Sequence, residues 1–369
     1  MASIRRKLAS IQEIREIHPI EGADRIEVAI IEAWQVVVGK GEFVAGDKVV
    51  YFEIDTFLPS SNPAFAFLMD RGTKEMEMGD SIVAGHVLRT AKLRGTYSQG
   101  LVMHPEQLGL DPTAHSVGDD VTSVVGVCEY VPVMTNPEAI GRYDERLAPV
   151  TDAIRIQSCP QAWDIMKKVD CRTSVKVDGT SMTIVYDSES GEFRIFGHHY
   201  ELDPADGLGK QALATCERQG IAGFCESHPD YVVQFEFAGP KVNKNRLGLG
   251  THRAFVFAVW VDGRTKVPFE DEAACPGKDF DALRKSACPV LDMTPAQLGS
   301  VEDAIRWVDG LRGNIVRDRL DEGIVFHVMG RGEIPESEWP TTKAYLMDVL
   351  GEPLEMKVIS NRYLMKHRI

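Results

Sequence analysis

Short β-type runs separated by turn residues set the tightest limit on how the first part of this chain can fold. They lie roughly 10 to 15 residues apart, at 25–31, 34–38, 48–54, 85–93 and 100–104. A stretch at 63–80, rich in methionine, phenylalanine and charge, interrupts the series. Strands this short and this closely spaced predict a small barrel or sandwich.

A barrel of the OB type, whose face commonly takes oligonucleotides, fits this plan. Residues 128–149 then change in character, with prolines and a run of charges that are typical of a linker. We therefore place a domain boundary near residue 145. This gives an OB-like nucleic-acid-binding domain at 1–145, followed by a second domain at 146–369.

The second domain mixes helical and β-type segments without regular alternation. Helices are expected at 161–168, 208–219 and 301–312, and strands at 173–176, 181–186, 192–196, 231–237, 254–261, 323–328 and 354–359. A doubly wound parallel sheet requires regular alternation, so the pattern favours an α+β class with antiparallel sheets and flanking helices.

The length and the cysteine pattern limit the number of domains and the cellular compartment. The 369 residues suffice for two domains, and no apolar run approaches the roughly 20 residues that a membrane span needs. The N-terminus lacks the apolar region of a signal peptide. The seven cysteines form no C-x-x-C pair, which argues against a zinc knuckle or a disulfide framework. We therefore expect a cytoplasmic protein with reduced thiols and no membrane partner.

The net charge of −14, taken alone, argues against nucleic acid, because contacts to phosphates need lysine and arginine. Net charge says little about local fields, however. Residues 85–104, 241–253 and 356–369 contain no acidic side chain. The nucleic-acid contacts predicted from the first two stretches are Lys92, Arg94, Lys244 and Arg246. An ordinary solvated surface is the alternative for each stretch.

One tetrapeptide has the residue types expected around a lysine nucleophile. Lys176-Val-Asp178-Gly179 lies between two β-type runs, so a rigid lysine precedes a turn glycine. A lysine nucleophile must lose its proton near neutral pH, which burial and neighbouring cations favour. The pattern alone is equally consistent with an exposed lysine in a hairpin.

This tetrapeptide resembles motif I of the covalent nucleotidyltransferases, the superfamily of polynucleotide ligases and mRNA capping enzymes. Four further segments follow in the order of that superfamily and resemble its motifs III, IIIa, IV and V: 235–240 (FEFAGP), 255–257 (FVF), 321–325 (DEGIV) and 355–361 (EMKVISN). Five matches in the correct order make this resemblance specific.

The N-terminal half resembles one branch of that superfamily. Residues 22–27, 34–38, 49–55 and 93–101 are similar to the leading OB domain of RNA ligase family 5, the Deinococcus-type ligases. DNA ligases and capping enzymes carry their OB domain after motif V. The domain order here therefore favours an RNA ligase. The resemblance covers nearly the whole chain.

The resemblance implies a reaction in three steps. Lys176 attacks the α-phosphorus of ATP and forms lysyl-AMP, the AMP passes to a 5′-phosphate end, and a 3′-hydroxyl then attacks and releases AMP. The implied cofactors are ATP and Mg²⁺ or Mn²⁺. The implied partner is nicked duplex RNA, with no obligate protein partner.

The resemblance also assigns roles to residues. Glu236 and Glu322 correspond to carboxylates that contact the ribose and metal-bound water. The resemblance also implies a catalytic role for Glu322. Phe257 is expected to stack on adenine. Lys357 is expected near the α-phosphate, where its like charge would lower the proton affinity of Lys176. Asp178 and Gly179 shape the loop.

Three positions depart from the family pattern. Gly197-His198-His199 stands where Ser-Arg-Asn is common, so His198 becomes the candidate phosphate contact, although paired histidines also permit a metal site. Ile359 replaces a second motif V lysine, and Ala258 replaces a frequent aspartate. Two alternatives therefore stay open: a catalytically impaired nucleic-acid-binding protein of the same fold, and an ATP-dependent DNA ligase.

Overall fold

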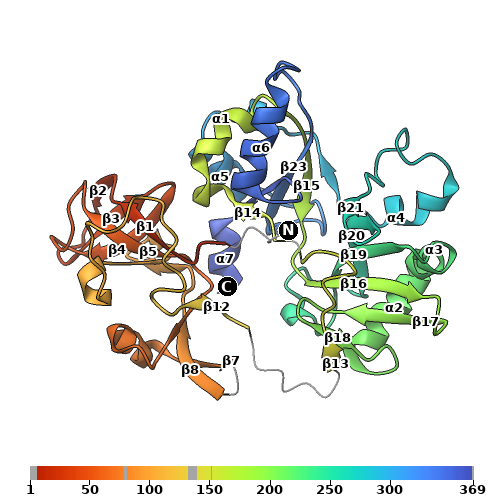
Figure 1. Cartoon of the computed structure of the whole chain (residues 1–369), viewed down its shortest axis with the longest axis horizontal. Coiled ribbons are helices and arrows are strands. Elements are labelled where there is room, and N and C mark those ends of the chain that lie inside the picture. The colour runs from red at the N-terminus through yellow and green to blue at the C-terminus, as the bar shows by residue number, and fades with distance from the viewer. Residues whose placement is uncertain (1–5, 79–80, 132–138, 151, 368–369) are drawn as a thin grey trace.

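The computed structural model describes residues 6–78, 81–131, 139–150 and 152–367. Figure 1 shows three groups of elements side by side: the N-terminal strands, a central sheet with helices, and a second large sheet with helices. Antiparallel sheets flanked by helices make this an α+β protein, as the sequence predicts.

Four small sheets build the N-terminal half. The first contains β1 (Ala9–Glu13), β5 (Lys48–Phe52) and β11 (Leu101–Met103); the second contains β2 (Glu16–Pro19), β3 (Ile26–Ile31) and β4 (Trp34–Gly39); the third contains β6 (Thr56–Pro59), β7 (Lys74–Met78), β8 (Ser81–Val87) and β12 (Cys128–Glu129); the fourth pairs β9 (Ala91–Leu93) with β10 (Thr96–Ser98). Within the expected stretch at 63–80, Pro63–Arg71 form a 3₁₀ helix and Lys74–Met78 form β7; residues 79–80 lie outside the described part of the chain.

Strand β5 lies between two buried apolar clusters of the N-terminal half. Val50 and Phe52 point into one buried cluster, and Val49 and Tyr51 point into another. Because successive side chains of a strand face opposite sides, β5 is covered on both faces and reads as a continuous apolar run.

Two sheets build the second half. The larger has the strand order β13 (Ala139–Arg142), β18 (Tyr200–Leu202), β17 (Glu192–Phe196), β16 (Thr180–Asp187), β19 (Tyr231–Ala238), β20 (Arg253–Val261) and β21 (Thr265–Lys266). The smaller has the order β14 (Ile154–Arg155), β24 (Glu355–Ile359), β23 (Gly323–Gly330), β15 (Asp170–Lys176) and β22 (Val290–Leu291).

Helices pack on one face of each sheet. On the larger sheet these are α2 (Gly207–Gln219), α3 (Ile221–Ser227) and α4 (Asp281–Lys285), and on the smaller sheet they are α1 (Trp163–Met166), α5 (Val301–Asp309) and α6 (Trp339–Leu350). Helix α5 begins with a capping box between Ser300 and Asp303 and stops at Gly310, short of the predicted end. The opposite face of the larger sheet carries two smaller apolar clusters, one that includes Phe196 and Trp260 and one that includes Val177 and Phe255.

The K-x-D-G turn joins these two sheets. The sequence suggested a hairpin, with the strands before and after the turn as neighbours. Instead β15 pairs with β22 and β23, whereas β16 pairs with β17 and β19. The hairpin expectation was therefore wrong, and the tetrapeptide crosses from one sheet to the other.

The N-terminal half contacts the second half through polar groups. Glu53 accepts hydrogen bonds from Arg6 Nε and Ser158 Oγ, both at 2.6 Å. Gln99 donates to Asn361 in α7 (Asn361–His367) at 3.1 Å, and Figure 1 shows α7 between the N-terminal strands and the rest of the chain. The centre of the predicted linker, 132–138, lies outside the described residues. Strand β13 already pairs with the second half, and the boundary near 145 stays a prediction.

Among the described residues, the structure contains no helix with the length and apolar character that crossing a bilayer requires.

Candidate active site

Lys176, at the end of β15, lies beside Glu322, which immediately precedes β23. The two strands pair with Lys176 opposite Gly323. The lysine Nζ is 3.0 Å from Oε1 and 3.1 Å from Oε2 of Glu322. The structure therefore brings together the predicted motif I lysine and motif IV carboxylate, which are 146 residues apart.

Glu236 approaches Lys176 from the other sheet. It lies on β19 opposite Ser181 of β16. Burial raises the pKa of Glu236 to about 8, although the charge of Lys176 opposes this rise. Burial also raises the pKa of Glu322, and Lys176 again opposes the rise. Two carboxylates thus act on one lysine: Glu322 is buried and pairs with it, and Glu236 is partly exposed and acts through its charge.

The pKa of Lys176 is shifted in the opposite direction to the one expected from the motif V lysine. Burial lowers the pKa of Lys176, but the charges of Glu322 and Glu236 outweigh burial and hold that pKa above its ordinary value. The like charge of Lys357 does not reverse this direction. In the protein without ligands, Lys176 is therefore an ammonium group.

Asp178 is held from two sides. Arg246 Nη1 donates to Asp178 Oδ1 at 2.9 Å, and the Tyr363 hydroxyl of α7 donates to Oδ2 at 2.7 Å. Gly179 is required for a different reason from the one that the turn suggested. A Cβ at this position would lie 2.4 Å from the backbone oxygen of Phe237, so only glycine allows the loop to approach β19 this closely.

A second group of charges surrounds Lys357 on β24. Its Nζ donates to Asp152, and burial lowers the pKa of Lys357 while Asp152 opposes that change. Arg155 pairs in register with Lys357. Its guanidinium is 8% exposed and lies over the Trp34 ring, and among the described residues its Nε and Nη1 atoms have no hydrogen-bond partner.

Sequence reasoning missed Asp152, Arg155 and Tyr363. The one available signal was Arg155, a single cation between Ile154 and Ile156 where an apolar strand would otherwise continue. Asp152 and Tyr363 stand in no pattern that marks them, because only folding brings them to Lys357 and Asp178.

Phe257 occupies an irregular position on β20. Gln234 pairs with Ala258 and Phe235 pairs with Val256, which leaves Phe257 as an extra residue on its strand. Its half-buried ring lies between two apolar clusters. A bulge of this kind re-aims a side chain, which is consistent with the predicted role of Phe257 toward an adenine ring.

His198 lies in the turn between β17 and β18, with its ring 4.3 Å from that of His199. Within the described residues, no hydrogen bond or ion pair joins it to Lys176, Glu236 or Glu322. Burial, together with the charge of His198, lowers the pKa of His199 to about 4. The expected role of His198 at a phosphate stays a prediction.

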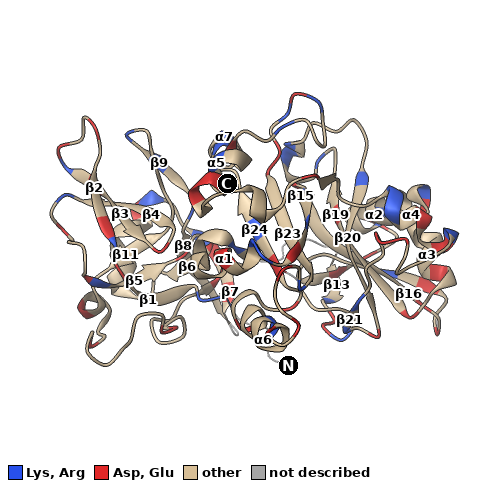
Figure 2. Ribbon diagram, turned by 90° about the horizontal axis from the view of Figure 1, so that it is seen from above, with Lys and Arg blue, Asp and Glu red and all other residues tan. Residues whose placement is uncertain are grey.

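Of the four predicted nucleic-acid contacts, three are exposed or stacked on an aromatic ring, and one is engaged by Asp178. Arg94 is exposed at the turn between β9 and β10, and Lys92 lies over the Tyr97 ring. Figure 2 shows the β9 hairpin projecting from the N-terminal half. Lys244 is exposed. Arg246 instead joins Asp178, which occupies it inside the site.

Over nearly its whole length, the chain is similar to solved structures of an RNA ligase from Naegleria gruberi. The structure with PPi matches with 26% sequence identity and a TM-score of 0.74, covering 99% of each chain. A mutant with AMP and Mn matches with 26% identity and a TM-score of 0.76, and a mutant with ATP and Mn with 25% and 0.75; both matches cover 98% of this chain and 99% of that chain. A family model described as an OB-fold domain matches residues 8–105. A search of the curated proteins found no match.

Proposed function

We propose that this protein is an ATP-dependent RNA ligase. It would seal 3′-hydroxyl and 5′-phosphate ends at nicks in duplex RNA, as RNA ligase family 5 does. The observation that carries the proposal is the lysine of the K-x-D-G turn, which pairs with Glu322 and lies within the influence of the Glu236 charge where two sheets meet. The full-length similarity to an ATP-bound RNA ligase supports it. In this proposal, residues 1–145 form the nucleic-acid-binding domain and 146–369 the catalytic domain.

The cations around Lys176 fit a polyphosphate. Lys357 and Arg155 lie side by side on β24 and β14, and two buried nitrogen atoms of Arg155 have no hydrogen-bond partner in the described part of the chain. A buried donor without an acceptor is costly, so these atoms suit the oxygens of a bound phosphate chain. The Phe257 ring offers an aromatic surface to adenine.

The carboxylates fit a hard divalent cation. Among the described residues, no group of three or more His, Cys, Asp or Glu side chains could hold a metal by itself. Mg²⁺ commonly binds to one or two carboxylates together with waters and substrate phosphates, and Glu322 with Glu236 supplies that number. A bound divalent cation would supply positive charge that offsets these carboxylates and so lowers the pKa of Lys176.

The first step then follows from the residues of the chain. Lys176 must lose its proton, after which Nζ forms a bond to the α-phosphorus of ATP. The bond between that phosphorus and the bridging oxygen breaks, and pyrophosphate leaves with the electron pair. Lys357 and Arg155 would balance the charge of the departing group.

Mass spectrometry of the intact protein tests this function. Incubation with ATP and Mn²⁺ should add the mass of one AMP, and peptide mapping should place it on Lys176. Lys176→Ala should abolish the adduct, and Glu322→Ala should remove most of it. Lys168→Ala, at an exposed lysine before β15, should leave it unchanged.

Two results would contradict the proposal. An adduct that maps to another lysine would show that Lys176 is not the nucleophile. A protein that binds nicked RNA but forms no adduct would be the catalytically impaired alternative. Parallel reactions with nicked RNA and nicked DNA would distinguish an RNA ligase from a DNA ligase.

A further inference from the structure

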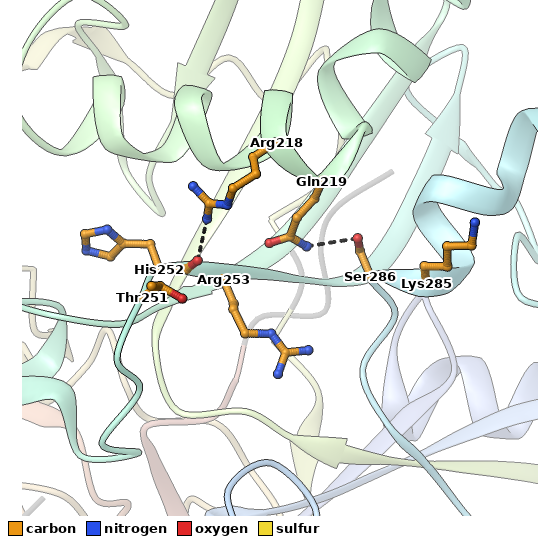
Figure 3. A pocket seen from close by; sticks show the side chains of 7 residues that line it. All are labelled: Arg218, Gln219, Thr251, His252, Arg253, Lys285 and Ser286. Carbon is orange, nitrogen blue, oxygen red and sulfur yellow. Dashed lines mark hydrogen bonds between the residues drawn. The ribbon is translucent and has the colours of Figure 1, made fainter.

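A hollow of about 300 Å³ opens at the start of β20, where the ends of α2 and α4 approach that strand. Figure 3 shows the side chains that line it, which are Arg218, Gln219, Thr251, His252, Arg253, Lys285 and Ser286. It lies outside the group of residues around Lys176, and the proposed reaction does not use it.

Hydrogen bonds fix the wall of this hollow. The Gln219 side chain bonds to both the amide and the carbonyl of Ala254, at 2.9 and 2.8 Å, and donates to Ser286 Oγ at 2.9 Å. Arg218 Nη2 donates to the backbone oxygen of His252 at 2.6 Å. Side chains therefore cover the strand edge. Nε and Nη1 of Arg218 stay available to donate to a ligand.

The charges at the hollow are not balanced. Within the described parts of the chain, no carboxylate pairs with Arg218, Arg253 or Lys285, although the chain carries 55 acidic residues against 41 lysines and arginines. Arg253 is instead held over the Phe255 ring, with its central carbon 4.5 Å from the ring centroid. Figure 2 shows lysine and arginine between α2 and α4, with acidic residues on the outer side of α3 and α4. Cations grouped without counter-ions attract an anion.

The register of the sheet places this hollow next to the reaction centre. Phe255 lies opposite Glu236, and Arg253 lies opposite Ala238, on adjacent strands. Because a strand rises about 3.3 Å per residue, Arg253 lies about 7 Å along the strand from the level of Glu236, on the same face as Phe255. The acid-free segment 241–253 ends at the same place.

We propose that this hollow binds a backbone phosphate of the nucleic-acid strand whose end is joined at Lys176. The inference rests on the proposed ligase function and adds a substrate contact to it. Arg253 would donate to the phosphodiester oxygens from one side of the strand end, and Arg218 and Lys285 would add positive charge from the side of α2 and α4.

Charge reversal tests the proposal in the full-length protein. Binding of a fluorescent nicked RNA duplex is measured over a range of salt concentrations for Arg253→Glu, for Lys285→Glu and for the double variant. Lys278→Glu is the matched control, because Lys278 is exposed beside α4 but does not line the hollow. Self-adenylylation is measured on the same samples, and Arg253→Gln and Lys285→Gln repeat the test without added negative charge.

The double variant should weaken duplex binding roughly tenfold at low salt and make the salt dependence shallower by about 0.7 to 0.9 per lost contact. Lys278→Glu should change neither, and self-adenylylation should be retained in all variants. Duplex binding equal to that of Lys278→Glu would overturn the proposal, and so would a raised ATP requirement with unchanged duplex binding. A wild-type protein that binds the duplex but forms no AMP adduct would refute the ligase function and leave the phosphate contact standing.

Discussion

The hydroxyl of Tyr363 donates a 2.7 Å hydrogen bond to Oδ2 of Asp178, across 185 residues of sequence. The other carboxylate oxygen accepts from Arg246 at 2.9 Å, and Tyr363 is completely buried. The hydrogen bond ties α7 to the loop that carries Lys176. Asn361, at the start of the same helix, accepts from Gln99 of the N-terminal half. Helix α7 therefore links the nucleophile loop to the OB-like strands.

Tyr363→Phe removes the hydrogen bond and keeps the ring. Because a buried carboxylate oxygen then lacks its donor, we expect the free energy of unfolding to fall by roughly 1 to 3 kcal/mol. We also expect slower self-adenylylation, because the loop that carries Lys176 is held less firmly. Urea denaturation and single-turnover formation of lysyl-AMP measure the two effects.

Tyr345→Phe is the matched control for this variant. The Tyr345 hydroxyl makes no hydrogen bond within the described part of the chain, so stability should change by no more than about 0.5 kcal/mol. Equal effects of the two variants on both readouts would show that the Tyr363 hydrogen bond does not position the loop.

Glu236→Gln should change how stability depends on pH. The pKa of Glu236 is raised to about 8 in the folded protein. Between the ordinary carboxyl pKa and this value, the folded state keeps a proton that the unfolded state releases, so rising pH destabilises the fold. Glutamine has no such titration. In the absence of metal ions, the Tm of wild type minus that of Glu236→Gln should therefore decrease from about pH 5 to pH 8 and then level off. A difference that stays constant over this range would contradict the burial of a protonated Glu236.

Arg94→Ala should weaken binding to nicked duplex RNA and make its salt dependence shallower, because an exposed cation at the β9–β10 turn is lost. Arg306→Ala is the control. Arg306 is also exposed, but it pairs with Asp303 at 3.0 Å on α5. Fluorescence anisotropy at several salt concentrations compares the two variants. An unchanged slope for Arg94→Ala would remove this turn from the interface.

His198→Ala tests whether this histidine replaces the arginine of the family pattern. An imidazole is cationic only below about pH 6.5, so a phosphate contact through His198 should make the dependent step slow down as the pH rises. His198→Arg should abolish that decline, and His198→Ala should slow the step roughly tenfold.

Single-turnover sealing by the pre-adenylylated enzyme, between about pH 5.5 and 8.5, measures this effect. His199→Ala is the control, because burial keeps the pKa of His199 near 4 and that ring is neutral throughout. Identical profiles for wild type and His198→Ala would show that another group holds the phosphate.

Several features could be predicted from the sequence because they depend on local pattern. The strands around Trp34 and Val50 follow from short apolar runs between turns, and α2 follows from its apolar spacing. Lys176, Glu236 and Glu322 stood out because each lies in a motif whose order along the chain could be read directly.

The contacts between distant segments required the tertiary structure. The sequence places Lys176 and Thr180 four residues apart and suggests a hairpin, but hydrogen bonding with β23 and β19 separates their strands into two sheets. The pKa of Lys176 depends on carboxylates that only this packing brings near. Motif order alone could therefore not show that this pKa is raised. The local sequence pattern thus determined which side chains are candidates for the reaction. The pairing of β15 and β23, the close approach at Gly179 and the docking of α7 decided their charge and their neighbours, because electrostatic energy depends on distance in space and on burial.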